Sequence, residues 1–224
     1  MKIVKITSML VLLMSLMSCE KESGEIAPDT TKELAKIVDI TNYVIIGKSY
    51  LGFEQIPYLI SLHADGKARF ELPGGHIPYS YTYKDEVLTL DQNGGNLIRI
   101  RIRQDSISSF ISTTKEFASY QLIKIPSINL LAGNSFGGVW KMIVAGASAP
   151  QLSTVKFTDT QYAEATLYNP IPNKSYSVLH NIAAKTLDPV TQHAALWVLM
   201  DGKLEGYRYN LASEKHYSGT FIQQ

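Results

Sequence analysis

From residue 43 onward, apolar and polar residues alternate along the chain with a period of two. The clearest case runs from Ile98 to Arg103, where three isoleucines alternate with three arginines. A β-strand points successive side chains to opposite faces of its sheet, so this pattern predicts strands with one buried and one wet face. The same alternation recurs in Ala68–Leu72, Leu88–Leu90 and Val155–Phe157. We therefore expect an antiparallel, all-β fold.

Turn signals separate these segments at short intervals. Asp65-Gly66 and Asp201-Gly202 are typical of two-residue hairpin turns, whose central residues need positive φ. Looser breaks occur at Pro73-Gly74-Gly75, Asn93-Gly94-Gly95 and Asn169-Pro170. Many short strands with few helices predict a β-barrel or a β-sandwich.

One short helix is expected ahead of the strands. Thr30 and Glu33 form a capping-box pattern, which predicts a helix over residues 31–38. The polar residues 20–29 before it are typical of a solvated tether.

The chain also carries an internal repeat. Gly47–Phe53 matches Gly133–Val139, with the glycines, the serine and the apolar end in step. Three more matches follow in the same order: Ser80-Tyr81-Thr82 with Ser175-Tyr176-Ser177, Thr89-Leu90-Asp91 with Thr186-Leu187-Asp188, and Phe117–Leu122 with Tyr217–Phe221. We expect two tandem small β units, residues 43–125 and 126–224, each a barrel or a sandwich. The alternative is one larger barrel or sheet formed by both halves.

The second half opens with a glycine-rich segment that ends in Gly138-Val139-Trp140 and leads into a predicted strand. This segment resembles the Gly-x-Trp opening of lipocalin-like, or calycin-type, barrels. In the first half, Phe53 stands near the place of the tryptophan. The resemblance implies a meander of antiparallel strands closed on itself, in some members around a ligand cavity.

The only cysteine lies at the end of a basic and then apolar N-terminal segment. Lys2 and Lys5 precede the apolar run Met9–Met17, and Ser18-Cys19 follows it. This order is typical of a secretory signal peptide, here residues 1–18. The apolar run is shorter than the ~20 residues that a membrane-spanning helix needs.

The end of this segment, Leu16-Met17-Ser18-Cys19, resembles the lipobox of bacterial lipoproteins, although Met17 is larger than the usual residue there. The resemblance implies cleavage before Cys19 and lipidation of Cys19 with acyl chains such as palmitate. Two or more acyl chains give stable membrane anchoring. Glu20, which is not Asp, favours the outer membrane of a Gram-negative bacterium, on its periplasmic or its surface side. Residues 19–42 would then be a lipidated tether with the short helix.

Charge and residue spacing exclude several function classes. Without Lys2 and Lys5 the chain has 19 basic residues against 20 acidic ones, so the basic footprint of a nucleic-acid-binding protein is missing. The five histidines show no zinc-type spacing, and the sequence has no Asp-x-Asp-x-Asp-Gly calcium loop. We therefore expect neither a metal nor another cofactor.

The sequence also contains one motif of a catalytic type. Gly133-Asn134-Ser135-Phe136-Gly137 fits the Gly-x-Ser-x-Gly nucleophile elbow, which requires a strand-to-helix turn. Val139–Val144 predicts a strand instead, so a tight entry into a strand explains these glycines. The acid pair Asp85-Glu86 cannot by its spacing define a glycosidase. No catalytic residue is predicted.

A stripe of three arginines is the first candidate for ligand contact. Arg99, Arg101 and Arg103 would share one strand face at ~7 Å spacing and could grip phosphate or carboxylate groups on a glycan. The alternative is a wet face whose charges deter edge aggregation.

A stripe of three tyrosines is the second candidate. Tyr79, Tyr81 and Tyr83 could stack on sugar rings. The alternative is a position in the core, where each tyrosine needs only one hydroxyl partner.

These observations lead to competing hypotheses of function. The first is a membrane-anchored, non-catalytic binding or structural module of the cell envelope, with a glycan or a small apolar molecule as its ligand. The alternatives are a hydrolase of envelope polymers and an assembly subunit. A pocket of converging titratable residues favours the hydrolase, whereas an apolar cavity or an exposed Tyr or Arg face favours the binding module.

Overall fold

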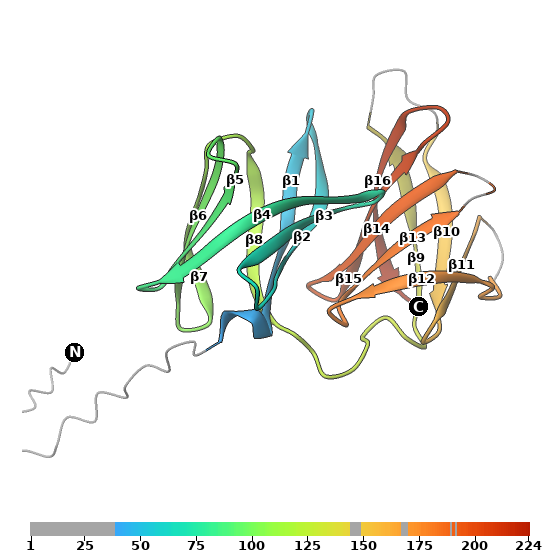
Figure 1. The fold of residues 1–224 in the computed structure, drawn as a ribbon. Helices are drawn as coiled ribbons and strands as arrows, with labels where there is room; N and C mark the ends of the chain where they lie inside the picture. Colours follow the sequence, from blue (N-terminus) through green and yellow to red (C-terminus); the bar gives the residue numbers. More distant parts are fainter. Residues whose placement is uncertain (1–38, 144–148, 167–169, 189, 191) are drawn as a thin grey trace, which may run out of the picture. The chain divides into compact units, whose positions relative to one another are not determined.

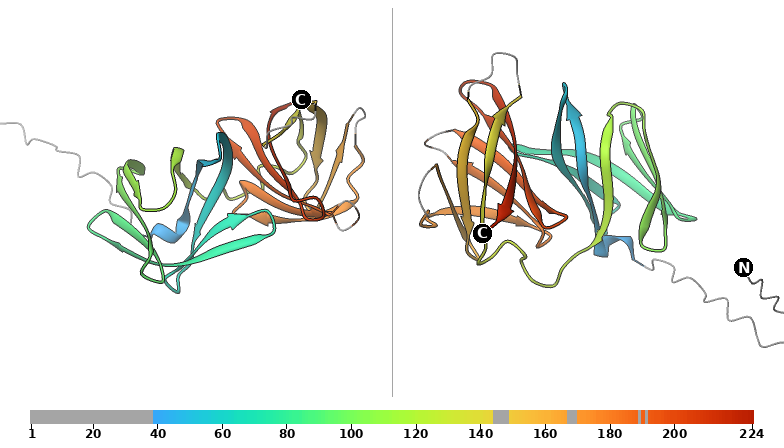
Figure 2. Two further views of the ribbon diagram at one scale, coloured as in Figure 1. Left: turned by 90° about the horizontal axis from the view of Figure 1, so that it is seen from above. Right: turned by 180° about the vertical axis from the view of Figure 1, so that it is seen from behind.

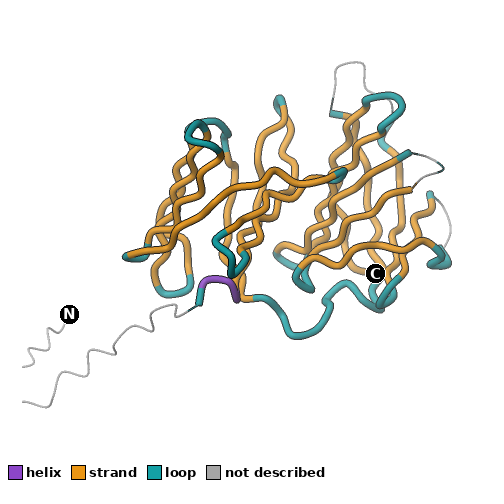
Figure 3. The backbone as a smooth tube through the Cα atoms, viewed as in Figure 1, coloured by secondary structure: helices purple, strands orange, loops and turns teal. Residues whose placement is uncertain are grey.

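The computed structural model describes residues 39–224, apart from residues 144–148, 167–169, 189 and 191. Within the described residues the chain forms sixteen β-strands and the short 3-10 helix η1 (Ile40–Asn42) (Figures 1 and 3). The signal peptide and the tether with Cys19 that the sequence predicts, and the helix expected over residues 31–38, lie outside the described residues. The described residues all belong to one compact unit.

The first eight strands form one antiparallel sheet in the order β7-β6-β5-β4-β3-β2-β1-β8. Their bounds are β1 (Tyr43–Leu51), β2 (Glu54–Leu62), β3 (Lys67–Leu72), β4 (Gly75–Lys84), β5 (Val87–Gln92), β6 (Asn96–Arg103), β7 (Ser106–Ser112) and β8 (Phe117–Lys124). The chain winds as a meander, and its last strand returns to pair with the first. The edges of this sheet are therefore β7 and β8.

The next eight strands form a closed barrel, which Figure 2 shows from two further sides. Their bounds are β9 (Ser135–Met142), β10 (Gln151–Phe157), β11 (Gln161–Ala165), β12 (Lys174–Leu179), β13 (Ala183–Asp188), β14 (His193–Met200), β15 (Lys203–Asn210) and β16 (Lys215–Gln223). Each strand pairs with its sequence neighbours, and β16 pairs with β9 to close the ring. The all-β class is thus confirmed, and two separate eight-stranded antiparallel sheets support tandem barrel units over one shared sheet.

The alternating patterns form strands because each buries its apolar set on one face. In β6 the isoleucines Ile98, Ile100 and Ile102 are buried, and the arginines between them are exposed. The predicted hairpin at Asp201-Gly202 has positive φ at both residues, 50° and 73°. These two residues therefore join β14 to β15 as a tight turn.

Each sheet encloses its own apolar core. The inner face of the first sheet collects isoleucines, leucines and aromatic residues around Tyr58 and Phe70. The interior of the barrel is filled by aromatic rings. The Trp140 and Trp197 rings lie 5.0 Å apart, and Phe221 packs edge-on against both at 5.1 and 5.2 Å. Packing of this kind makes the barrel interior a solid core.

A third apolar cluster joins the outer faces of the two sheets. Val44, Ile46 and Leu59 of the first sheet pack with Leu196 and Val198 of the barrel, among others. Strand β14 is therefore buried on both faces, since its Ala195 and Trp197 belong to the barrel core. Its sequence accordingly reads as a continuous apolar run.

The structure corrects the register of the predicted repeat in the first strand of each unit. Gly47 lies in the middle of β1, whereas Gly133 precedes β9 with φ of 77°. The position equivalent to Gly47 is Gly138: a Cβ on Gly47 would collide with the carbonyl oxygen of Ser119 in β8, and one on Gly138 with that of Thr220 in β16. The sequence match had paired Gly47 with Gly133, which lies five residues before its structural equivalent Gly138.

The Gly-x-Trp match in the first half changes for the same reason. Trp140 is buried in β9, whereas Phe53 lies in the turn after β1 and is fully exposed. By the register of the two glycines, the position that corresponds to Trp140 is the buried Ser49. Only the barrel therefore carries the tryptophan of this motif in its core.

Candidate functional site

The end of the barrel at which its longer connections gather is the first candidate site. The β9–β10 connection spans residues 143–150 and the β11–β12 connection residues 166–173, whereas β14 and β15 are joined at the opposite end by residues 201–202. Variable functional loops commonly gather at one end of a rigid scaffold. We call the cavity at this end the barrel mouth.

The barrel mouth is a cavity of about 190 Å³ with a polar lining. Its walls come from strands β10 to β15 and the start of the β11–β12 connection. The lining residues are Gln151, Leu152, Ser153, Tyr162, Glu164, Ala165, Thr166, Lys174, Thr186, Asp188, His193, Ala195 and Arg208. Charged groups of both signs therefore converge on one small space.

Arg208 forms the floor of the barrel mouth. It points inward from β15 and is only 7% exposed. Its guanidinium lies between two rings, 4.6 Å from the centroid of Trp140 and 4.7 Å from that of Tyr217. Nη1 donates to Glu164 Oε1 at 3.2 Å and Nη2 to Gln151 Oε1 at 3.1 Å, while the buried Nε has no partner among the described residues. Burial lowers the pKa of Arg208, and the charge of Glu164 opposes that shift.

Glu164 is the acceptor at the centre of this network. Its Oε1 accepts hydrogen bonds from the Trp140 indole at 2.6 Å and from the Ser153 hydroxyl at 2.7 Å, besides the bond from Arg208. Strands β9, β10, β11 and β15 are thereby tied together by one carboxylate. Bonds to an ionised acceptor are stronger than neutral ones, so these residues are held in place.

A second charge pair crosses the rim. Lys174 donates to Asp188 at 2.5 Å, and this hydrogen bond raises the pKa of the lysine. The charges of both ion pairs, Arg208–Glu164 and Lys174–Asp188, act on the imidazole of His193. Its pKa is lowered mainly by burial and also by Arg208, while Glu164 and Asp188 act in the opposite direction.

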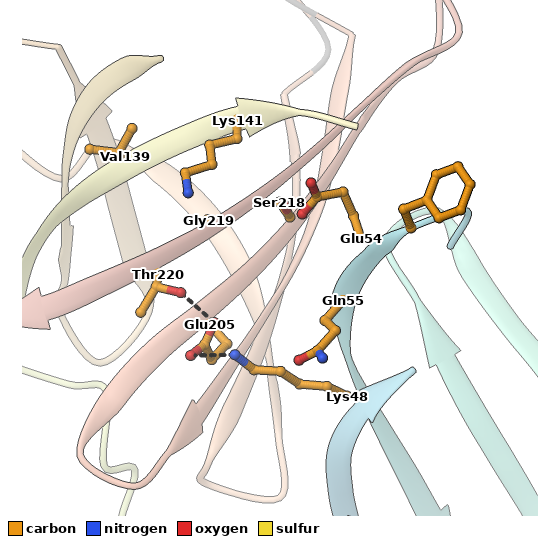
Figure 4. A pocket seen from close by; sticks show the side chains of 10 residues that line it. Lys48, Glu54, Gln55, Val139, Lys141, Glu205, Ser218, Gly219 and Thr220 are labelled. Atoms are coloured by element: carbon orange, nitrogen blue, oxygen red, sulfur yellow. Dashed lines mark hydrogen bonds and ion pairs between the residues drawn. The ribbon is translucent and has the colours of Figure 1, made fainter. Parts of the chain in front are cut away.

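A larger cleft of about 470 Å³ lies where the β1–β2 hairpin faces the outer surface of the barrel (Figure 4). Its lining residues are Lys48, Phe53, Glu54, Gln55, Val139, Lys141, Glu205, Ser218, Gly219 and Thr220. Lys48 Nζ lies 2.9 Å from Glu205 Oε1, and the Thr220 hydroxyl donates to Glu205 Oε2 at 2.8 Å. In Figure 4 the Lys141 ammonium points into the cleft from β9.

The predicted arginine stripe lies on the outer face of the first sheet. Arg99, Arg101 and Arg103 are exposed, as expected for one strand face. Arg103 Nε lies 3.5 Å from Glu86. None of the three lines the barrel mouth or the cleft.

The predicted tyrosine stripe belongs to the core of the first sheet. Tyr79 is buried, and Tyr81 and Tyr83 are half-buried against the same apolar cluster. The Tyr81 hydroxyl donates to the carbonyl oxygen of His63 at 2.8 Å. The structure therefore places these rings as the core alternative describes, and burial raises the pKa of all three hydroxyl groups.

The Gly-x-Ser-x-Gly segment has no elbow geometry. Ser135 is the first residue of β9, so a strand follows it rather than a helix. Across the described residues, no group of three or more His, Cys, Asp or Glu side chains is arranged to hold a metal ion. In the same part of the chain, no helix has the length and hydropathy that crossing a membrane would require.

The residues of the barrel mouth escaped prediction because they come from separate strands. Glu164, Lys174, Asp188, His193 and Arg208 lie on β11 to β15, and no sequence spacing connects them. One local signal was present. Residues 204, 206 and 208 share one face of β15, and this face points into the barrel. The first two are Leu204 and Gly206, so Arg208 is the charged residue on an otherwise uncharged inner face.

Comparison of the chain with protein-family models, with curated proteins and with solved structures gave no match.

Proposed function

We propose that the chain is a lipid-anchored, non-catalytic binding module of the cell envelope, and that the barrel mouth holds the end of a glycan. The observation that carries the proposal is a charge-balanced polar cavity above a filled aromatic interior. Arg208 and Lys174 supply two positive charges, and Glu164 and Asp188 supply two negative ones. A neutral sugar enters such a cavity without leaving any buried charge unbalanced.

The filled interior argues against the small apolar ligand. Below the Arg208 floor lie Trp140, Trp197 and Phe221 in mutual contact, so a hydrocarbon has no space there. The walls offer the hydroxyls of Ser153 and Thr186 and the carboxylates instead. Ligand pockets usually measure ~300–1,000 Å³, so a smaller mouth suits one terminal sugar ring rather than a long segment.

The anchor is proposed from the residues before the described region. Leu16-Met17-Ser18-Cys19 resembles a lipobox, and Cys19 would carry the acyl chains. Glu20 favours retention at the outer membrane, with the binding module on its periplasmic or surface side. Multiple acyl chains on one residue suffice for stable attachment.

Hydrolysis of an envelope polymer is the second candidate, since Glu164, Asp188 and His193 converge in the barrel mouth. A glycosidase needs one carboxyl group as acid and one as base or nucleophile. Here Glu164 Oε1 already accepts three hydrogen bonds, and Asp188 is held by Lys174. Release of reducing ends from soluble envelope glycans by the purified chain would establish this candidate over the binding module.

The test of the binding proposal is calorimetric titration with the neutral sugars glucose, mannose and N-acetylglucosamine. One of them should bind, and Glu164→Gln should weaken that binding about tenfold or more, because charge-assisted hydrogen bonds are lost. Glu116→Gln is the matched control, since Glu116 is exposed in the first sheet's last connection and should leave the affinity unchanged. Equal affinities of wild type and Glu164→Gln would place the sugar elsewhere.

A further inference from the structure

The cleft beside the β1–β2 hairpin has features that the barrel mouth does not explain. One wall is fixed: Glu205 is 7% exposed, bonded to Thr220, and paired with Lys48. These contacts hold β1 against β15 and give the cleft a shaped floor. A preorganised polar surface of this kind costs little further entropy when a ligand binds.

The charges in the cleft are balanced. Lys48 and Lys141 face Glu54 and Glu205, so two positive groups stand with two negative groups. Neither a polyanion nor a polycation gains from this arrangement, because each attraction comes with a repulsion nearby. Gln55, whose side chain stands near Lys48 in Figure 4, adds neutral donor and acceptor groups.

The barrel strands around the cleft leave no edge for a peptide. Strand β1 pairs with β2 and β8, while β2 pairs with β1 over residues 54–61 and with β3 only over residues 59–62. On the barrel side, β9, β15 and β16 are each paired along both edges. A peptide that binds by adding a strand needs a free edge, so this mode of recognition is closed on the barrel side of the cleft.

An aromatic ring stands open at the rim. Phe53 is 101% exposed at the tip of the β1–β2 hairpin, next to Gly52 with φ of 62°. Such exposure leaves both faces of the ring available to a partner, while most of the other residues that line the cleft are polar. An open aromatic face beside amide, hydroxyl and carboxylate groups suits the two-sided surface of a sugar, apolar on its face and polar at its edge.

We infer that this cleft is a second saccharide site, which holds several units of a neutral polysaccharide with one unit stacked on Phe53. The site has its own contacts and does not depend on occupancy of the barrel mouth. Together, two sites on one chain would favour polymers over short sugars through effective concentration.

The test is calorimetric titration of the full chain with three neutral hexasaccharides, of glucose, mannose and N-acetylglucosamine, and with acidic hexagalacturonate. At least one neutral hexamer should bind, and Phe53→Ala should weaken it about three- to tenfold through loss of the ring contact. Ile222→Ala is the matched control, because Ile222 is an exposed apolar residue of β16 that does not line the cleft. It should leave the affinity unchanged.

Three outcomes would overturn the inference: equal affinity of wild type and Phe53→Ala, preference for hexagalacturonate, or no binding of any neutral hexamer. The two proposals fail separately. If hexamer binding depends on Phe53 but not on Glu164, the result supports a sugar site in the cleft and rejects one in the barrel mouth. The opposite result is monosaccharide binding that depends on Glu164, together with hexamers that bind no more tightly and are unaffected by Phe53→Ala. It would support a sugar site in the barrel mouth and reject one in the cleft.

Discussion

Arg208 shows how one inward-pointing charge is held inside a barrel. Its burial is costly, and the cost is offset by the bonds to Glu164 and Gln151 and by the two flanking rings. Removing the cation would leave Glu164 partly buried without its charge partner. The residue thus couples stability of the barrel to the architecture of its mouth.

We predict that Arg208→Met lowers the free energy of unfolding by about 2–4 kcal/mol, because breaking a largely buried ion pair is strongly destabilising. Urea denaturation followed by tryptophan fluorescence measures this change. Arg101→Met is the control, since Arg101 is exposed on the outer face of β6 and should change stability by no more than about 0.5 kcal/mol. Equal stability of the two variants would show that the Arg208 network contributes nothing.

Two histidines predict how stability responds to acid. Burial is the main cause that lowers the pKa of both His180 and His193 below 6.5. At His180 the nearby His63 lowers the pKa further, and the charge of Glu71 raises it. At His193 the charge of Arg208 lowers the pKa further. Below pH 6.5 the unfolded chain therefore binds more protons than the folded one, and stability falls as the pH falls toward the folded-state values. Stability contributed by these groups is fully present above that window.

The prediction is that His180→Gln together with His193→Gln flattens the loss of stability between pH 7.5 and pH 5.5. Urea midpoints at both pH values provide the measurement. His76→Gln, at an exposed position on β4, should keep the wild-type slope. A double variant with an unchanged slope would contradict the proposed role of the two imidazoles.

At the scale of elements, the two sheets close differently. In the barrel, β9 and β16 are joined by backbone pairing over seven positions. In the first sheet β7 and β8 are the two edges, and rings bridge them: Phe110 lies 4.5 Å from Phe117 and 4.9 Å from Tyr120. Both sheets nevertheless use a glycine in their first strand to let the last strand approach.

We predict that Gly138→Ala destabilises the chain by about 3 kcal/mol, because the new Cβ would meet the backbone of β16, which cannot move aside without breaking barrel pairing. Gly74→Ala is the control, since a Cβ there meets nothing within 4 Å. Thermal unfolding of both variants tests the difference. If Gly138→Ala and Gly74→Ala unfold at the same temperature, the close approach of β9 and β16 is not required for stability.

The positions of the strands could be predicted from the sequence, but the residues that face one another across neighbouring strands could not. Alternation in Ile98–Arg103 identified β6 because burial of one face follows directly from a period of two. The register of Gly138 could not be inferred, since it depends on which carbonyl of β16 lies opposite. The barrel mouth stayed hidden for a related reason: Glu164 and Arg208, on β11 and β15, meet only after the three strands between them have folded into the ring.

At the scale of the whole molecule, the proposed lipid anchor precedes a folded body that carries the proposed sugar sites. The two sheets share an apolar cluster that includes Leu59 and Leu196, and ion pairs Lys48–Glu205 and Lys185–Glu71 accompany it. The described residues accordingly belong to one compact unit. The residues before it would supply attachment without taking part in the sugar sites.

We predict that Cys19→Ala leaves the fold intact and releases the protein from membranes, because the proposed acyl chains attach only there. Fractionation after a salt wash, with circular dichroism of the soluble protein, measures both effects. Ser23→Ala, in the tether, is the control and should stay with the membrane fraction. Persistence of the Cys19→Ala protein in washed membranes would contradict the anchor.

The two tryptophans allow a direct measurement of the proposed binding of a neutral sugar in the barrel mouth. The Trp140 indole donates to Glu164 at 2.6 Å and the Trp197 indole to Thr186 at 3.4 Å, and both acceptors line the mouth. We predict that the two indole N–H signals in a ¹H–¹⁵N spectrum shift saturably during titration with at least one of glucose, mannose and N-acetylglucosamine. Indole signals that stay fixed throughout all three titrations of the folded protein would show that none of these sugars binds in the barrel mouth.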